Sequence, residues 1–121
     1  MKKITTIQVT ILVLTITAFL SNAQTFEWAR SFSGTSVERG YAIAVDGNGN
    51  VYTTGTLGGT ADFDPSPTGT STLSTAGADD IFVSKLDASG NYVWAKRIGG
   101  TESELFFSMI VDASGNVFTT G

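Results

Sequence analysis

The segment from Trp28 to Gly55 recurs later in the chain as Trp94 to Gly121, and the two copies align without a gap. Both copies begin with Trp-Ala and end with the pattern Val-Asp-x-x-Gly-Asn-Val-x-Thr-Thr-Gly. A tandem repeat of this length is typical of arrays in which each unit packs against its neighbours and cannot bury its apolar faces alone. The repeat therefore predicts an array architecture.

The first residues are predicted to be a leader. Lys2 and Lys3 give a basic start, and an apolar run follows from Ile11 to Leu20. Ser21-Asn22-Ala23 then places small residues at the two positions that signal peptidase recognises. We predict a signal peptide over residues 1–23, cleaved after Ala23, and a secreted or cell-surface location. The alternative is a retained membrane anchor, although the apolar run is short for a span of roughly 20 residues.

Composition excludes several kinds of protein. The chain has no cysteine, and hence neither disulfides nor thiolate metal sites, and no histidine, so the usual general base is missing. It holds seven basic and eleven acidic residues, and loss of Lys2 and Lys3 with the leader leaves five against eleven, a net charge of −6. This balance argues against nucleic acid or an anionic membrane surface as a partner.

Alternation with period two predicts strands after the leader. Tyr41 to Val45 is apolar on both faces, which predicts a strand buried on both sides. In the connection from Leu57 to Asp80, Pro65 and Pro67 argue against a regular strand across their part. The other expected strands are Phe26 to Phe32, Val51 to Thr56, Ile81 to Leu86 and Tyr92 to Ile98.

Turns with the sequence Asp-x-x-Gly-Asn occur at Asp46 to Asn50, Asp87 to Asn91 and Asp112 to Asn116. Glycine and asparagine supply the left-handed backbone that a tight hairpin needs. Each repeat then holds two hairpins, hence four antiparallel strands in up-and-down order. We therefore predict an all-β fold of β-propeller blades, each a four-stranded antiparallel meander, in an incomplete ring.

The blocks YAIAVDGNGNVYTTG, DDIFVSKLDASGNYVWAKRIGG and FSMIVDASGNVFTTG resemble the SBBP β-propeller repeat of secreted bacterial proteins, and more distantly NHL-type blades. The resemblance covers nearly all of the chain after the leader. It implies an extracellular repeat scaffold with no enzymatic residues to carry over. It also implies that the Tyr41 to Val45 strand is innermost and the Trp94 strand outermost.

We expect three parts after the leader. Residues 24–32 would be a lone outer strand that closes the ring, residues 33–98 the first complete blade, and residues 99–121 the first half of a second blade. Because a ring needs at least about four blades, the chain is expected to be the N-terminal fragment of a longer protein.

Two loops suggest calcium. Asp46, Asn48 and Asn50 match the opening of an EF-hand loop, but Val51 and Leu57 stand where that loop needs glycine and glutamate, so a structural turn is favoured. The better candidate is Asp62, Asp64 and Ser66, with oxygens on alternate loop residues that suit calcium, and with Asp79 and Asp80 able to approach from the far end of the connection. A solvated acidic loop is the alternative, and no other cofactor is expected.

Trp28 and Trp94 suit either sugar stacking or packing between sheets, and their repeated strand position favours packing. Arg30, Lys96 and Arg97 are expected to be solvated at a sheet edge. Without histidine or a Gly-x-Ser-x-Gly elbow there is no catalytic triad, so no catalytic or cofactor-binding residue is predicted.

The leading hypothesis is a non-catalytic extracellular or cell-surface β-propeller repeat module for binding or scaffolding, with a protein or glycan ligand. The first alternative is part of a propeller enzyme or cofactor-binding propeller whose site lies in other blades. A cell-surface adhesin stalk is the second alternative.

Overall fold

The computed structural model describes residues 24–106 and 108–121, and this part of the chain forms antiparallel strands without a helix. The all-β fold predicted from the repeat is therefore confirmed. The signal peptide predicted over residues 1–23 lies outside the described residues.

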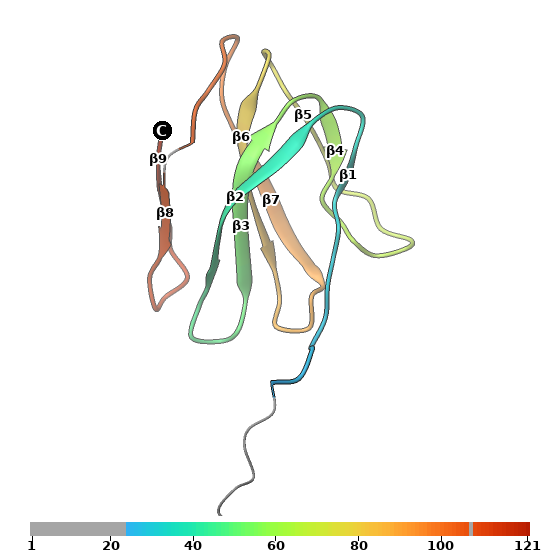
Figure 1. The fold of residues 1–121 in the computed structure, drawn as a ribbon, viewed down its shortest axis with the longest axis vertical. Helices are drawn as coiled ribbons and strands as arrows, with labels where there is room; N and C mark the ends of the chain where they lie inside the picture. The colour runs from blue at the N-terminus through green and yellow to red at the C-terminus, as the bar shows by residue number, and fades with distance from the viewer. Residues whose placement is uncertain (1–23, 107) are drawn as a thin grey trace, which may run out of the picture.

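Four strands form the central sheet: β2 (Glu38–Val45), β3 (Val51–Leu57), β6 (Asp80–Leu86) and β7 (Tyr92–Ile98). Their order is β2-β3-β6-β7, and every neighbouring pair is antiparallel. Because sequential strands are also neighbours in space, the sheet is an up-and-down meander, as a propeller blade requires. Side chains alternate between two faces of this sheet, and each face is covered by a different element (Figure 1).

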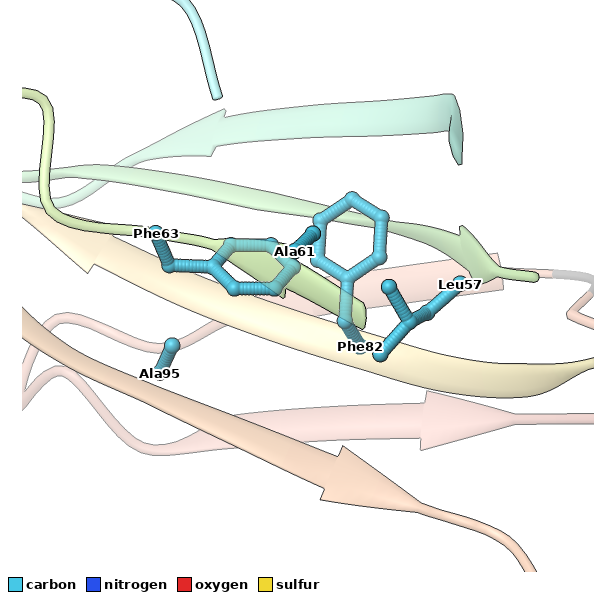
Figure 2. Close-up of a cluster of buried hydrophobic side chains, with 5 residues drawn as sticks. All are labelled: Leu57, Ala61, Phe63, Phe82 and Ala95. Carbon is cyan, nitrogen blue, oxygen red and sulfur yellow. The ribbon is translucent and has the colours of Figure 1, made fainter. Parts of the chain in front are cut away.

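The first face, called here the core face, packs against a small sheet of β1 (Ser33–Gly34), β4 (Thr60–Asp62) and β5 (Thr72–Ser74), in the order β1-β4-β5. Buried side chains from the two sheets meet there: Leu57, Phe82 and Ala95 from the blade, and Ala61 and Phe63 from the small sheet and its loop (Figure 2). The rings of Phe63 and Phe82 lie 4.9 Å apart in a tilted arrangement. Each large apolar side chain buried in this way contributes about 1.5–3 kcal/mol.

The second face, called here the hairpin face, packs against β8 (Ser108–Val111) and β9 (Val117–Thr120), a two-stranded antiparallel hairpin. In Figure 1 this hairpin stands beside β2 and β3, on the side away from the small sheet. Tyr52 of β3 is fully buried, and its hydroxyl lies 3.4 Å from the carbonyl oxygen of Gly115, between β8 and β9. The hairpin thus stacks on the blade as the start of a second blade would.

The prediction of a strand over Phe26 to Phe32 is wrong. Within the described part of the chain, these residues have no ladder partner, and side chains hold the segment instead. Trp28 Nε1 donates to the carbonyl oxygen of Ala88 at 3.0 Å, and the Phe32 ring lies 4.9 Å from that of Phe63. Ring closure by residues 24–32 stays a prediction. So do the boundary between the first and second blades after residue 98, and the expectation that the chain is the N-terminal fragment of a longer protein.

The connection from Leu57 to Asp80, in which no strand was predicted, contributes β4 and β5. The two prolines do lie outside these strands, in the loop between them.

The prediction that Tyr41 to Val45 is buried on both sides is also wrong. Tyr41, Ile43 and Val45 are exposed, because β2 is the edge strand and the small sheet does not cover Ile43 and Val45 on its core face, while Tyr41, at the bulge, stacks only on the Phe106 ring at 6.3 Å. The physical consequence is an apolar sheet surface in contact with water.

Candidate functional site

The three Asp-x-x-Gly-Asn turns have the same internal hydrogen bonds. In the first, Asp46 Oδ1 accepts from the N–H groups of Asn48 at 2.9 Å and Asn50 at 3.0 Å, and Oδ2 accepts from the Asn50 amide at 2.8 Å. Gly49 adopts φ 80°, the left-handed region that favours glycine. Both oxygens of the carboxylate are therefore used to shape the turn, and Asp46 has the structural role favoured by the sequence.

The turn aspartates at positions 46, 87 and 112 are held as anions. For Asp46, the side-chain hydrogen bond from Asn50 is the largest cause, and with the backbone donors it outweighs desolvation and lowers the pKa to about 2. The pKa of Asp112 is lowered first by its asparagine side chain, and that of Asp87 first by the backbone N–H of Asn91.

The predicted calcium ligands lie on one loop, between β4 and β5. Asp62 Oδ1 accepts from the N–H groups of Asp64 at 3.0 Å and Ser71 at 2.8 Å. Asp64 Oδ1 accepts from Ser66 N–H at 2.9 Å, and Ser66 Oγ accepts from Gly69 N–H at 2.9 Å. This chain of bonds folds the loop from within. The backbone donors hold the pKa of Asp62 below its ordinary value.

Asp80 does not join this loop. It is fully buried at the start of β6, where Oδ2 accepts from Ala76 N–H and from the Arg97 guanidinium. Burial raises the pKa of Asp80, but the hydrogen bonds from Ala76 and Arg97, together with the Glu104 side chain and the charge of Arg97, outweigh it and the net pKa is lowered. Within residues 24–106 and 108–121, no three His, Cys, Asp or Glu side chains are grouped so that they could hold a metal ion. Calcium at Asp62, Asp64 and Ser66 stays a prediction.

A polar hollow of about 290 Å³ opens beside the same loop. Its lining comes from three separate segments: Arg30, the loop residues Pro65, Ser66 and Pro67, and the turn residues Gly90, Asn91 and Tyr92. Tyr92 is fixed from both sides, because its hydroxyl bonds Ser71 Oγ and accepts from Ala95 N–H at 2.9 Å.

Trp28 and Arg30 clamp the N-terminal segment onto the second turn. Arg30 Nε donates to the carbonyl oxygen of Gly90 at 3.0 Å, and its guanidinium carbon lies 5.9 Å from the Trp28 ring centroid. Arg30 was expected to be solvated; it is exposed, but three carbonyl oxygens hold it in place. The sequence offered no signal for this clamp, because it joins residues 60 apart that follow no common pattern.

The remaining aromatic and basic residues considered in the sequence, Trp94, Lys96 and Arg97, lie on β7 and have different surroundings. Trp94 packs with its ring centroid 6.1 Å from that of the buried Tyr52, so it serves packing, as its repeated position indicated. Lys96 is exposed, whereas Arg97 pairs with Asp80.

Comparison with known proteins agrees with this geometry. The family of SBBP β-propeller repeats matches residues 27–56, which run from the clamp through β2 and β3. This chain carries an SBBP β-propeller repeat.

Other comparisons add a distant relative. An uncharacterised WD repeat-containing protein of Acanthamoeba polyphaga mimivirus is 32% identical over 109 residues, which cover 78% of this chain and 8% of the viral protein. The chain thus spans a small part of the length of that relative. No solved structure matches. Among the described residues, none forms a helix that could cross a membrane.

The SBBP match covers the first copy of the sequence repeat, and the second copy supplies β8 and β9. The chain is therefore a repeat module of β-propeller type, and in its described part β8 and β9 stack on the four-stranded blade β2-β3-β6-β7.

Proposed function

We propose that this chain is a non-catalytic, extracellular or cell-surface SBBP module that binds a protein or glycan through the polar hollow beside the loop from β4 to β5. The observation that carries the proposal is the hollow itself. Loop residues from three segments line it, and the blade behind them holds it in shape. Loops on a rigid scaffold are the usual place for binding residues.

The lining suits recognition of another molecule. Pro67 and Tyr92 offer ring surfaces at a small cost in conformational entropy, because neither side chain rotates freely there. Arg30 is held by turn carbonyl oxygens and brings a fixed positive charge to the hollow. This chemistry fits a polar ligand with an acceptor group, such as a carboxylate or a sugar hydroxyl.

The non-catalytic part of the proposal is supported by how the acidic side chains of the turns and of the loop are used. The chain has no histidine, and the turn and loop aspartates accept backbone hydrogen bonds. The extracellular location is supported by the leader pattern of residues 1–23.

Glycan and protein arrays probed with the labelled chain test this function, with Pro67→Glu as the variant. Pro67 is exposed and lines the hollow, so glutamate there should reduce binding at least about tenfold. Thr70→Glu is the matched control, since Thr70 is exposed on the same loop but does not line the hollow. Equal loss in both variants, or no binding on either array, would overturn the proposal.

A further inference from the structure

Two carboxyl groups face each other where the connection between β7 and β8 passes the start of β6. Asp80 Oδ1 and Glu104 Oε2 are both buried, and neither accepts a hydrogen bond from any donor in the described part of the chain. A Cβ atom placed on Gly99 would lie 2.5 Å from the first oxygen and 2.7 Å from the second, so both oxygens border the same small space. The two carboxyl groups also lie within hydrogen-bonding reach of each other.

The other oxygen of each carboxyl group is held in place. Asp80 Oδ2 accepts from the N–H group of Ala76 at 2.8 Å and from the guanidinium of Arg97. Glu104 Oε1 accepts from the N–H group of Gly100 at 2.9 Å. Neither carboxyl group can turn its second oxygen away without breaking these bonds. The two second oxygens are therefore fixed opposite each other.

The charges around the two oxygens do not balance. Among the described residues, Arg97 forms an ion pair with Asp80, whereas Glu104 has no ion-pair partner. The nearby side chains of Asp79, just before β6, and of Glu102, exposed on the connection, add further negative charge. Two ionised carboxylates at this range in a buried space would repel each other strongly. A positive charge must lie between the two oxygens.

A proton fits this space better than a metal ion does. Calcium takes about 6–8 oxygen ligands, and no third His, Cys, Asp or Glu side chain joins Asp80 and Glu104 in the part of the chain that the structure describes. A single proton needs only these two oxygens. It turns the repulsion into a charge-assisted O–H···O⁻ hydrogen bond and satisfies both buried oxygens at once.

We propose that Asp80 and Glu104 share one proton, so that Glu104 is a neutral carboxylic acid that donates from Oε2 to Asp80 Oδ1. The proton is assigned to Glu104 because the Arg97 guanidinium and the Ala76 N–H group stabilise Asp80 as the anion. This bond, called here the carboxyl latch, ties the connection between β7 and β8 to the blade. When the proton leaves to solvent, two anions face each other and the connection is released.

The latch makes stability depend on pH in the direction opposite to the turns. A glutamate in the unfolded chain loses its proton near pH ~4.3, whereas the folded chain keeps the shared proton above that pH. The folded state then binds more protons, so stability falls as the pH rises. The stabilisation is fully present below the pH at which the unfolded chain titrates, and it is lost when the shared proton leaves.

The latch is separate from the binding function proposed above. It lies in the connection that follows β7, whereas the polar hollow lies beside the turn between β6 and β7, at the opposite end of these two strands (Figure 1). It also needs no ligand.

The test compares the full 121-residue chain, expressed with its own leader and purified in the form that the host leaves, with Glu104→Gln. The glutamine amide can donate to Asp80 Oδ1 as the acid does, and it cannot lose that proton. The two melting temperatures should agree at pH ~5. At pH ~9 the wild-type chain should melt at least about 4 °C below the variant.

Glu102→Gln is the matched control, since it removes an exposed carboxylate from the same connection. Its melting temperature should follow that of the wild-type chain across the whole pH range. A gain like that of Glu104→Gln would show that general relief of negative charge is the cause, and would overturn the latch.

Infrared spectra give a second measurement that does not depend on the variant. Wild-type chain labelled with carbon-13 at the glutamate side-chain carboxyl should show one protonated carboxylic acid at pH ~6, and the band should disappear as the pH rises. An unfolded glutamate would be ionised at that pH. If Glu104→Gln does not fold, this band alone decides.

Three further results would overturn the proposal. They are melting temperatures of wild type and Glu104→Gln that stay parallel from pH ~5 to pH ~9, a folded wild-type chain without the acid band, and calcium that raises the melting temperature of wild type but not of Glu104→Gln. The third would place a metal ion between the two oxygens. A chain that failed these tests but still bound an array ligand would leave the function proposed above untouched.

Discussion

Asn50 donates its side-chain amide to Asp46 Oδ2 at 2.8 Å, and this bond recurs between Asp87 and Asn91 at 3.0 Å and between Asp112 and Asn116 at 2.7 Å. The backbone N–H of each asparagine donates to the other oxygen of the same aspartate. One pair of side chains thus closes the β2–β3, β6–β7 and β8–β9 turns in the same way. The anionic form of the aspartate is the better acceptor, which links the turns to pH.

Acid should therefore destabilise the module. The pKa of Asp46 is about 2 in the folded chain, below its ordinary value of 3.8, so the unfolded chain takes up the proton first as the pH falls. The stabilisation is fully present above the ordinary value and is lost as the pH falls through the folded value. Asp46→Asn should lower the melting temperature by several degrees at pH 7, and the difference from wild type should shrink toward pH 2. Melting curves from pH 7 to pH 2 measure this.

Glu27→Gln is the control for that experiment, because Glu27 is an exposed carboxylate in the N-terminal segment, outside the turns. Its effect should be small at every pH. A difference between Asp46→Asn and wild type that persists unchanged at pH 2 would contradict the assignment of the stabilisation to the ionised turn.

Gly55 should tolerate no side chain. A Cβ atom there would lie 1.7 Å from the backbone carbonyl oxygen of Arg39, close to the irregularity between Gly40 and Ala42 in β2. Backbone cannot move aside as a flexible side chain can, so Gly55→Ala should cost about 1–3 kcal/mol or more. In a module of this size each kcal/mol corresponds to roughly 4–8 °C in the melting temperature.

Gly47→Ala is the matched control for Gly55→Ala. Gly47 lies in the first turn, and a Cβ atom there would meet nothing within 4 Å. We expect its melting temperature to stay within a few degrees of wild type, or to rise slightly because alanine restricts the unfolded chain. Equal losses for the two variants would show that the close contact at Gly55 is not the cause.

The turns and the meander could be predicted from the sequence because their causes are local. Asp, Gly and Asn within five residues form each turn, and glycine at positive φ recurs at positions 49, 90 and 115. The small sheet could not be predicted, since β1 pairs with β4 across a long separation through segments of two and three residues. No periodic pattern exists over so short a length.

Burial of β2 was predicted wrongly for a different reason. Alternation shows that the side chains at positions 41, 43 and 45 are apolar, but it does not show whether another element covers them. For the candidate site, the acidic loop between β4 and β5 could be identified from the sequence, whereas the polar hollow beside that loop could not. Arg30 and Tyr92 reach the loop only through contacts such as Arg30 to Gly90 and Tyr92 to Ser71.

The loop from Asp62 to Ser71 should hold its shape without an ion. Asp62→Ala removes the acceptor for two backbone N–H groups and should lower the melting temperature by several degrees, with or without calcium. Asp62→Asn keeps a side-chain oxygen in that place and should restore most of the loss. Differential scanning fluorimetry with excess calcium and with a chelator measures both effects.

A calcium site at Asp62, Asp64 and Ser66 would give another outcome. Calcium would then raise the melting temperature of the wild-type chain, a chelator would lower it, and Asp62→Asn would abolish the response because a ligand charge is lost. That result would contradict a loop that is shaped by its own hydrogen bonds alone.

The leader gives the last prediction. If signal peptidase cleaves after Ala23, the exported chain begins at Gln24, which N-terminal sequencing or intact mass measurement detects directly. Ala23→Arg places a large charged side chain at the position that requires a small residue, so it should block processing and leave the chain attached to the membrane through its apolar run. Asn22→Gln changes the neighbouring position, which has no such requirement, and should be processed normally. An exported wild-type chain that retains Met1 would instead support the membrane anchor.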